Sequence, residues 1–278
     1  MDKLSKDAVK CAKCILLLLI STNVYAEVTT SKPLPADIYI GGFAGGGSST
    51  YVDLAQHGTA LYSPGKGGPL SVNAYGKSDA NASWIAGAHI GYKWAAFTDQ
   101  NNRRWNFVPA AELEAYYLGN TLTGNNLNNE TDRLAQHDFR VSFPMHTGVF
   151  LANAVLNVNH ATLQKFHPYV GVGVGTAIIS ISGANSTQTT PAEPGINHYN
   201  SDPNASAWAF AAQPKIGVSF ELANKTSLFV EYRFLYLSPN HYTFGSTQYS
   251  THVGTTDWNV TMGPLCYNMG TIGIQFDP

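Results

Sequence analysis

The most regular feature of the sequence is a period-two alternation of apolar and polar residues after residue 36. This period is typical of β-strands, whose successive side chains point to opposite faces of a sheet. We found no long stretch with the 3.6-residue period of an amphipathic helix. The pattern predicts an all-β fold of eight strands, at residues 37–45, 84–94, 105–118, 138–157, 167–181, 207–222, 227–238 and 267–276.

The segments between these strands alternate in length. The long, polar segments are 46–83, 119–137, 182–206 and 239–266, and the short ones are 95–104, 158–166 and 223–226. Transmembrane barrels have short turns on the periplasmic side and longer loops outside the cell. The alternation therefore predicts an eight-stranded antiparallel up-and-down transmembrane β-barrel with short periplasmic turns and four long extracellular loops.

Aromatic residues stand where such strands would leave a membrane. Trp84 and Trp94 lie ten residues apart on one strand face. At about 3.3 Å per residue and a tilt of about 40°, they are separated by roughly 25 Å along the membrane normal, the height of the apolar band of a barrel. Trp105 and Tyr117 bracket the next strand in the same way, and Phe276 closes the last one. We expect these five side chains to form interfacial girdles, the alternative being aromatic strand ends in a soluble sandwich.

Charged residues in the strands alternate with the apolar ones. Val230 and Tyr232 alternate with Glu231 and Arg233, and Phe139 and Val141 alternate with Asp138 and Arg140. A basic residue facing lipid at mid-membrane costs on the order of 2–4 kcal/mol, whereas side chains fill the interior of a barrel this narrow. We therefore expect a salt-bridged lumen, with a narrow ion path as the alternative. The residues predicted to form this lumen charge network are Lys93, Glu112, Glu114, Asp138, Arg140, Lys215, Glu221, Glu231 and Arg233.

Composition adds an export signal. Only 12% of residues are charged, about half the globular average. Four lysines precede the apolar run 14–20, and Val24-Tyr25-Ala26 suits signal peptidase. The run is shorter than the roughly 18 residues of a transmembrane helix. We expect a cleaved signal peptide (1–26), a periplasmic segment (27–36) and a barrel domain (37–278). Cleavage removes four Lys and two Asp, so the formal net charge changes from −2 to −4, and no basic cluster suggests a nucleic-acid partner.

The sequence predicts no catalytic, cofactor-binding or metal-binding residue. The glycine-rich strand 169–175 lacks the G-x-G-x-x-G spacing and is followed by no helical pattern, which argues against a dinucleotide loop. The histidines, among them His137, His146, His160 and His167, lack metal-ligand spacing on a shared element.

A lipid A-modifying enzyme would place a His and a Ser near the outer rim of the barrel. The last long segment contains candidates, but no His-x-Ser pair occurs in the chain and no carboxylate is placed to orient a histidine. These candidates are His241, Ser246, Ser250 and His252.

Several segments resemble one family. The segments HPYVGVGVG (167–175), PKIGVSF (214–220), SLFVEYR (227–233) and GTIGIQF (270–276) resemble the bacterial surface-antigen and opacity-type outer-membrane proteins, which have eight-stranded OmpA-like barrels. The resemblance implies surface exposure, immune recognition of the loops and, for some members, adhesion or weak porin activity. Such barrels usually end on an aromatic residue read by the barrel-insertion machinery. Here Asp277 and Pro278 follow Phe276, so either two extra residues are tolerated or the signal is weakened.

The leading functional interpretation is a non-enzymatic surface antigen or adhesin in the outer membrane of a Gram-negative cell. Its expected partners are outer-membrane lipid and lipopolysaccharide, the insertion machinery and host surface molecules, with no cofactor. The alternatives are a small porin with a narrow polar lumen and a lipid A-modifying barrel enzyme. A soluble lipid-binding barrel is the rival fold, and it would have to bury Glu112, Arg140, Lys215 and Glu231 around its ligand.

Overall fold

The computed structural model describes residues 37–98, 105–131, 134–163, 165–223 and 225–278. The predicted signal peptide (1–26) and the segment 27–36 lie outside the described residues. Within the described part of the chain, no helix has the length and apolar character needed to cross a membrane. The described part contains the short 3-10 helix η1 (Pro64–Lys66) and the strands β1 (Asp37–Ser49), β2 (Asp53–Ala60), β3 (Leu70–Ser78), β4 (Ala82–Lys93), β5 (Phe97–Thr98), β6 (Trp105–Thr131), β7 (Leu134–His160), β8 (Phe166–Ile181), β9 (Asn185–Thr190), β10 (Ala205–Ala223), β11 (Thr226–Leu237), β12 (Asn240–Phe244), β13 (Trp258–Met262) and β14 (Leu265–Phe276).

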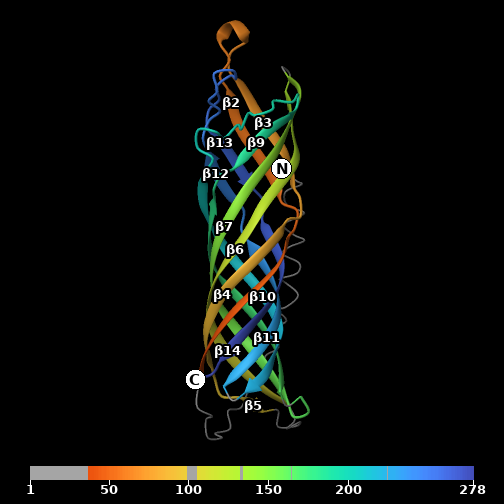
Figure 1. Ribbon diagram of the computed structural model, residues 1–278, viewed down its shortest axis with the longest axis vertical. Coiled ribbons are helices and arrows are strands. Elements are labelled where there is room, and N and C mark those ends of the chain that lie inside the picture. The colour runs from red at the N-terminus through yellow and green to blue at the C-terminus, as the bar shows by residue number, and fades with distance from the viewer. Residues whose placement is uncertain (1–36, 99–104, 132–133, 164, 224) are drawn as a thin grey trace, which may run out of the picture.

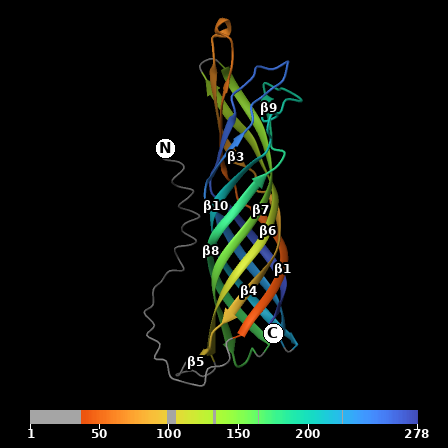
Figure 2. The ribbon, with the colours of Figure 1, turned by 90° about the vertical axis from the view of Figure 1, so that its left-hand side faces the viewer.

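Eight of these strands close into a hydrogen-bonded antiparallel ring. Its order is β1, β4, β6, β7, β8, β10, β11 and β14, and β14 pairs with β1 to complete it. Figures 1 and 2 show the resulting long, narrow barrel from two directions. Ring neighbours follow one another in the chain, as in an up-and-down barrel. The predicted all-β, eight-stranded antiparallel barrel is therefore confirmed.

An apolar band surrounds the outside of the ring. Exposed fractions of 42–57% are found for Ile38 and Ile40 on β1, Ile216 and Val218 on β10, and Ile274 on β14. Further exposed apolar side chains on the ring strands are Ile90, Leu113, Phe150, Val170, Val172, Val174, Phe210, Val230 and Ile272. Monomeric soluble proteins rarely expose a continuous apolar surface of this extent, whereas a barrel in lipid requires one.

The predicted girdle aromatics lie on the outside of the ring. Trp84 on β4 packs on Tyr117 of β6, with ring centroids 4.8 Å apart. Trp94 follows the last residue of β4, and Trp105 begins β6 at the same end of the barrel. Trp84, Trp94, Trp105 and Phe276 are exposed, and Tyr117 is half-buried.

The four segments predicted to be loops contain additional strands. β6 and β7 continue past the ring for a total of 27 residues each, β3 pairs with the extension of β6, and β2, β13 and β12 follow in order. On the other side, β9 pairs with the extension of β7. These strands stand at the upper end of Figure 1, opposite the short turns. The long segments thus build a β-structured extension of the barrel, which we call the cap.

The face assignment of β7 in the cap corrects the sequence prediction. Phe139 and Val141 are buried, whereas Arg140 is exposed and lies outside the lumen. Successive side chains of β7 still point to opposite faces in the cap. There, however, the outer face meets water in place of lipid, and the inner face meets an apolar core in place of the ionic lumen. Asp138 is buried beside an irregularity in the pairing of β7 with β9, away from the lumen charges.

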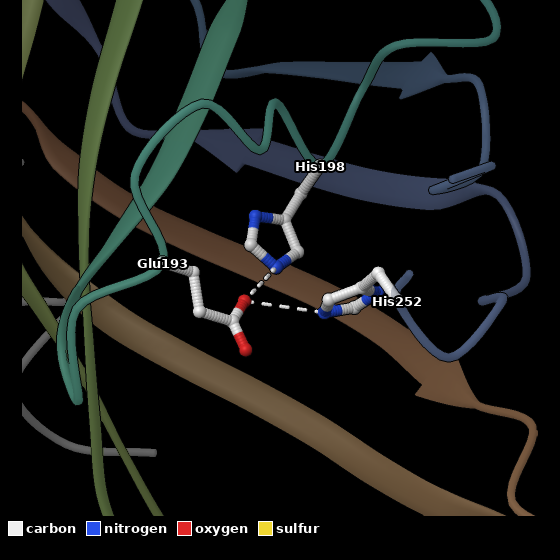
Figure 3. Close-up of side chains that lie close together, drawn as sticks. All are labelled: Glu193, His198 and His252. Atoms are coloured by element: carbon white, nitrogen blue, oxygen red, sulfur yellow. Dashed lines mark ion pairs between the residues drawn. The ribbon is translucent and has the colours of Figure 1, made fainter. Parts of the chain in front are cut away.

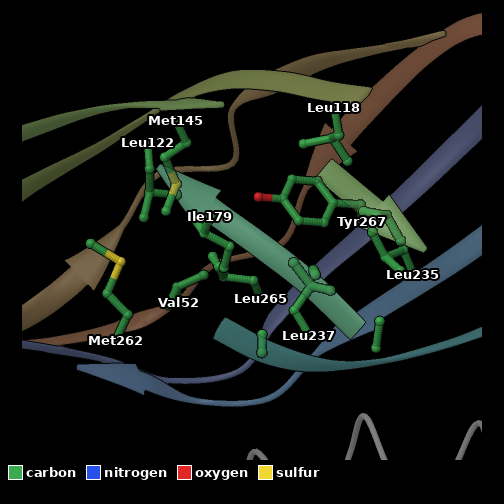
Figure 4. Packing of buried hydrophobic residues seen from close by; sticks show 14 of the residues in the cluster. Val52, Leu118, Leu122, Met145, Ile179, Leu235, Leu237, Met262, Leu265 and Tyr267 are labelled. Atoms are coloured by element: carbon green, nitrogen blue, oxygen red, sulfur yellow. The ribbon is translucent and has the colours of Figure 1, made fainter. Parts of the chain in front are cut away.

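The apolar core fills the upper part of the barrel and the cap. Figure 4 shows buried side chains that include Leu122, Met145, Ile179, Leu237 and Met262 packed among strands from several parts of the chain. Higher in the cap, the Phe244 ring stacks on the rings of Tyr199 and Phe143, with centroids 4.7 and 5.8 Å away. The interior is therefore apolar in the cap and in the part of the barrel next to it, and ionic nearer the short turns.

Candidate functional site

Five of the predicted lumen residues meet in one buried ionic network. Lys215 Nζ lies 2.6 Å from Glu112 Oε2, 3.1 Å from Glu114 Oε2 and 3.5 Å from Glu231 Oε2. Arg233 Nη1 lies 2.6 Å from Glu114 Oε1, and its Nη2 pairs with Glu231 Oε1. All five side chains are at most 5% exposed. Three acids and two bases thus pair inside the ring, and the group keeps a formal net charge of −1.

Tyrosine and amide groups complete the hydrogen bonding of the network. The hydroxyl of Tyr39 donates to Glu112 Oε1 at 2.8 Å, and that of Tyr169 donates to Glu231 Oε2 at 3.1 Å. Gln213 Nε2 donates to Glu114 Oε1 at 3.2 Å and accepts from Tyr116. Buried charge is costly unless each ion is paired and hydrogen-bonded. The network meets both conditions, which fits a structural plug.

The glycine-rich strand β8 makes room for Lys215. A Cβ placed on Gly171 would lie 3.0 Å from Lys215 Cγ and 3.1 Å from its Cε. A Cβ on Gly173 would lie 1.9 Å from Asn153 Oδ1. Glycine on the inner face of β8 therefore lets long polar side chains from neighbouring strands cross the narrow lumen.

The remaining predicted charges do not join this network. Lys93 Nζ lies 2.8 Å from Asp277 Oδ1 at the short-turn end. Glu221 lines a cavity of about 190 Å³ at that end, together with Lys93, His167, Lys225 and Asp277. Asp277, which follows the terminal aromatic, thus has a partner inside the barrel mouth. The predicted lumen charges therefore lie in three places. The five network residues lie in the middle of the barrel, Lys93 and Glu221 lie at the short-turn end, and Asp138 and Arg140 lie in the cap.

The cap contains a second group of polar side chains that sequence reasoning missed. Figure 3 shows Glu193 and His198, from the segment between β9 and β10, facing His252 from the segment between β12 and β13. Glu193 Oε2 lies 3.2 Å from His252 Nε2 and 3.6 Å from His198 Nε2. The expectation that no carboxylate would be placed beside a histidine of the last segment is therefore wrong. Neither segment has a recognisable ligand spacing, so only the folded chain shows the group.

His198 lies deep in the cap. Its ring makes edge-to-face contacts with Phe139 and Trp258, with centroids 5.2 and 5.7 Å away. Burial is the largest influence on its pKa and lowers it from the ordinary histidine value, although the hydrogen bond to the Ser186 carbonyl acts in the opposite sense. The imidazole is therefore neutral at pH 7.

Two candidates of the last segment, Ser246 and His241, have hydrogen-bond partners other than one another. Ser246 Oγ lies 3.3 Å from Ser201 Oγ and accepts a hydrogen bond from Gln248 Nε2. His241 Nδ1 lies 3.0 Å from Thr261 Oγ1. Within the described residues, the hydrogen bonds of Ser246 and His241 thus go to other groups, which does not support serine catalysis there.

Three comparisons place the chain among known proteins. Residues 145–277 match the family model described as surface antigen, and no curated protein matches the sequence. Neisserial surface protein A (NspA) is 13% identical, with 83% of this chain and 99% of that chain covered at a TM-score of 0.31. OprG from Pseudomonas aeruginosa is 12% identical, and the match covers 87% of this chain and 97% of OprG with a TM-score of 0.34. Ail from Yersinia pestis, solved with the heparin analogue sucrose octasulfate, is 12% identical. The match covers 80% of this chain and 98% of Ail with a TM-score of 0.23. At such values, these likenesses carry no functional argument.

The closed ring and its apolar girth define an outer-membrane-type β-barrel. The family match covers the end of β7 and the ring strands β8, β10, β11 and β14, so this half of the barrel carries the sequence pattern of the surface antigen family. The resemblance noted in the sequence is thereby confirmed for this part of the chain, and the fold is that of an outer-membrane-type β-barrel.

Proposed function

We propose that the protein is a non-enzymatic surface antigen that displays its cap outside the cell, with adhesion to host molecules as the finer role. The mature chain in this proposal starts after a signal peptide of residues 1–26, and residues 27–36 precede the barrel in the periplasm. Lipid and lipopolysaccharide contact the apolar band, and the barrel-insertion machinery delivers the chain to the membrane.

One observation carries the proposal: all the long segments lie at one end of a barrel whose interior is filled. β2, β3, β9, β12 and β13 belong to the cap, whereas at the opposite end few residues separate β4 from β5, β7 from β8 and β10 from β11. In transmembrane barrels the long segments face outward. Most of the chain beyond the ring is therefore available to antibodies or partner molecules rather than to transport.

The orientation is tested with epitope tags at two matched turns. Gly65 lies at the exposed tip of the β2–β3 hairpin, where an added Cβ would meet no atom within 4 Å. Ala161 is exposed in the short turn between β7 and β8. On intact cells we expect an antibody to detect a tag after Gly65 and not a tag after Ala161, while both are detected after lysis.

Detection of the Ala161 tag on intact cells, with the Gly65 tag hidden, would reverse the orientation and end the proposal. Each tagged protein should migrate faster on a gel before heating than after heating, which shows that the barrel has folded. A tag at Gly195 provides a third point on the cap, where external protease should cut it.

A further inference from the structure

The cap cluster joins two segments that are far apart in the sequence. Glu193 and His198 come from the connection between β9 and β10, and His252 comes from the connection between β12 and β13. Each offers one ligand atom, and the three atoms lie within 4.8 Å of one another. Figure 3 shows the Glu193 carboxylate facing both imidazoles.

The two imidazoles are oriented by backbone carbonyls. His198 Nδ1 lies 2.9 Å from the carbonyl oxygen of Ser186, and His252 Nδ1 lies 2.6 Å from that of Val253. An imidazole that donates Nδ1–H to a carbonyl has its lone pair on Nε2 when neutral, the arrangement usual for metal-binding histidines. Both Nδ1 atoms are thus held by backbone carbonyls, and both Nε2 atoms face the same carboxylate.

The carboxylate supplies an independent observation. Glu193 Oε2 is buried and has no hydrogen-bond partner within the described part of the chain, although the His252 Nε2 atom is only 3.2 Å away. A buried carboxylate oxygen without a donor is costly. A cation placed between the oxygen and the two nitrogens would satisfy all three atoms at once.

The spacing suits a small tetrahedral cation. Zinc binds histidine nitrogen and carboxylate oxygen at about 2.0–2.2 Å, which puts neighbouring ligand atoms of a tetrahedron about 3.3 Å apart. The observed separations from Glu193 Oε2 are 3.2 and 3.6 Å. The two histidine rings are nearly perpendicular, with centroids 5.3 Å apart, and the side chain of His252 is partly exposed.

We propose that Glu193, His198 and His252 form a zinc site that clamps the β9–β10 segment to the β12–β13 segment. Two imidazoles and one carboxylate are a ligand set that Zn²⁺ favours over Ca²⁺ or Mg²⁺, which prefer oxygen ligands. The clamp lies beside Trp258, so metal binding would hold the two segments over the apolar core of the cap. The inference is independent of whether the cap binds a host molecule.

The test measures Zn²⁺ binding to the full mature chain, refolded in detergent and freed of any histidine tag. Equilibrium dialysis against buffered micromolar Zn²⁺ should give one zinc per chain. His252→Ala and Glu193→Gln should weaken binding by about 100-fold or more, since each removes a ligand. His241→Ala is the matched control, because His241 is exposed on β12 and bonds Thr261 instead, and it should leave binding unchanged.

Cobalt provides a readout that does not depend on the variants folding. Co²⁺ bound to the wild-type protein should show the intense visible absorption of a tetrahedral site, and Zn²⁺ should abolish it by displacement. Absence of saturable zinc binding by the wild type, or an equal loss in His241→Ala and His252→Ala, would overturn the proposal and leave an imidazole–carboxylate ion pair.

Discussion

At the scale of the residue, Lys215 is the cation that holds the lumen network together. It contacts three carboxylates, whereas Arg233 contacts two of them. Without Lys215, three buried carboxylates would share one guanidinium. Removing one partner of a buried ion pair leaves a charge whose desolvation is no longer compensated.

We expect Lys215→Met to lower the free energy of unfolding by about 3–5 kcal/mol. The methionine keeps most of the side-chain volume, so the effect reports lost charge rather than a cavity. The measurement is the urea midpoint of reversible folding into lipid vesicles, followed by the heat-dependent gel shift.

The control is Lys77→Met. Lys77 pairs with Asp53 at 3.2 Å in the cap, but its side chain is 60% exposed. Exposed ion pairs contribute about 0–1 kcal/mol, so this variant should lie close to the wild type. Equal losses in the two variants would show that the lumen network contributes no more than a surface pair.

At the scale of the element, β7 passes through two environments without changing its alternation. In the ring its outer face carries Phe150 and Leu156 toward the apolar band, and in the cap its outer face carries Arg140. The inner face changes in the opposite sense, from Asn153 near the ionic network to Val141 in the apolar core. The strand therefore crosses from lipid to water partway along its 27 residues.

Adjacent aspartate substitutions test this face assignment. Val141→Asp would bury an unpaired carboxylate in the apolar cap, and we expect loss of about 4 kcal/mol or more of stability or a cap that is cleaved rapidly. Arg140→Asp changes an exposed residue and should cost no more than about 0.5 kcal/mol. Limited proteolysis of the folded proteins in detergent measures both. If Arg140→Asp were the more damaging change, the cap strand would have the opposite face inside.

At the scale of the whole molecule, the interior is divided along its length. The short-turn end opens into a polar cavity of about 190 Å³. The ionic network closes the middle, and the apolar core with Phe143, Tyr199 and Phe244 fills the end nearest the cap. An ion entering from the short-turn end would meet paired charges and then a layer of buried apolar side chains, which argues against the porin alternative.

We therefore expect no unitary conductance from the refolded wild-type protein in planar bilayers at moderate voltage. Folding in the same preparation is verified by the gel shift on heating, and vesicles without protein give the baseline. Stable single-channel steps that scale with salt concentration would contradict the sealed interior and restore the porin as the leading function.

The sequence by itself determined the ring. Each ring strand has one face against lipid, which produces a period-two pattern in the sequence itself. This pattern and the alternating segment lengths therefore predict the ring strands without any knowledge of tertiary contacts. The same logic identified Glu112, Glu114, Lys215, Glu231 and Arg233 as inward-facing, because lipid leaves such charges no other place. The sequence pattern did not show which carboxylate pairs with which cation, because these pairings depend on how strands that are not neighbours in the ring are aligned across the lumen.

Only the tertiary structure decided the cap. Its strands are polar outside and short, so residues 53–60 or 185–190 carry too weak a pattern to separate them from loops. Arg140 was misplaced because the alternation gives two faces but not the medium that each face meets. The meeting of Glu193 and His198 with His252 depends on two connections folding over one apolar core, and no local spacing in the chain records it.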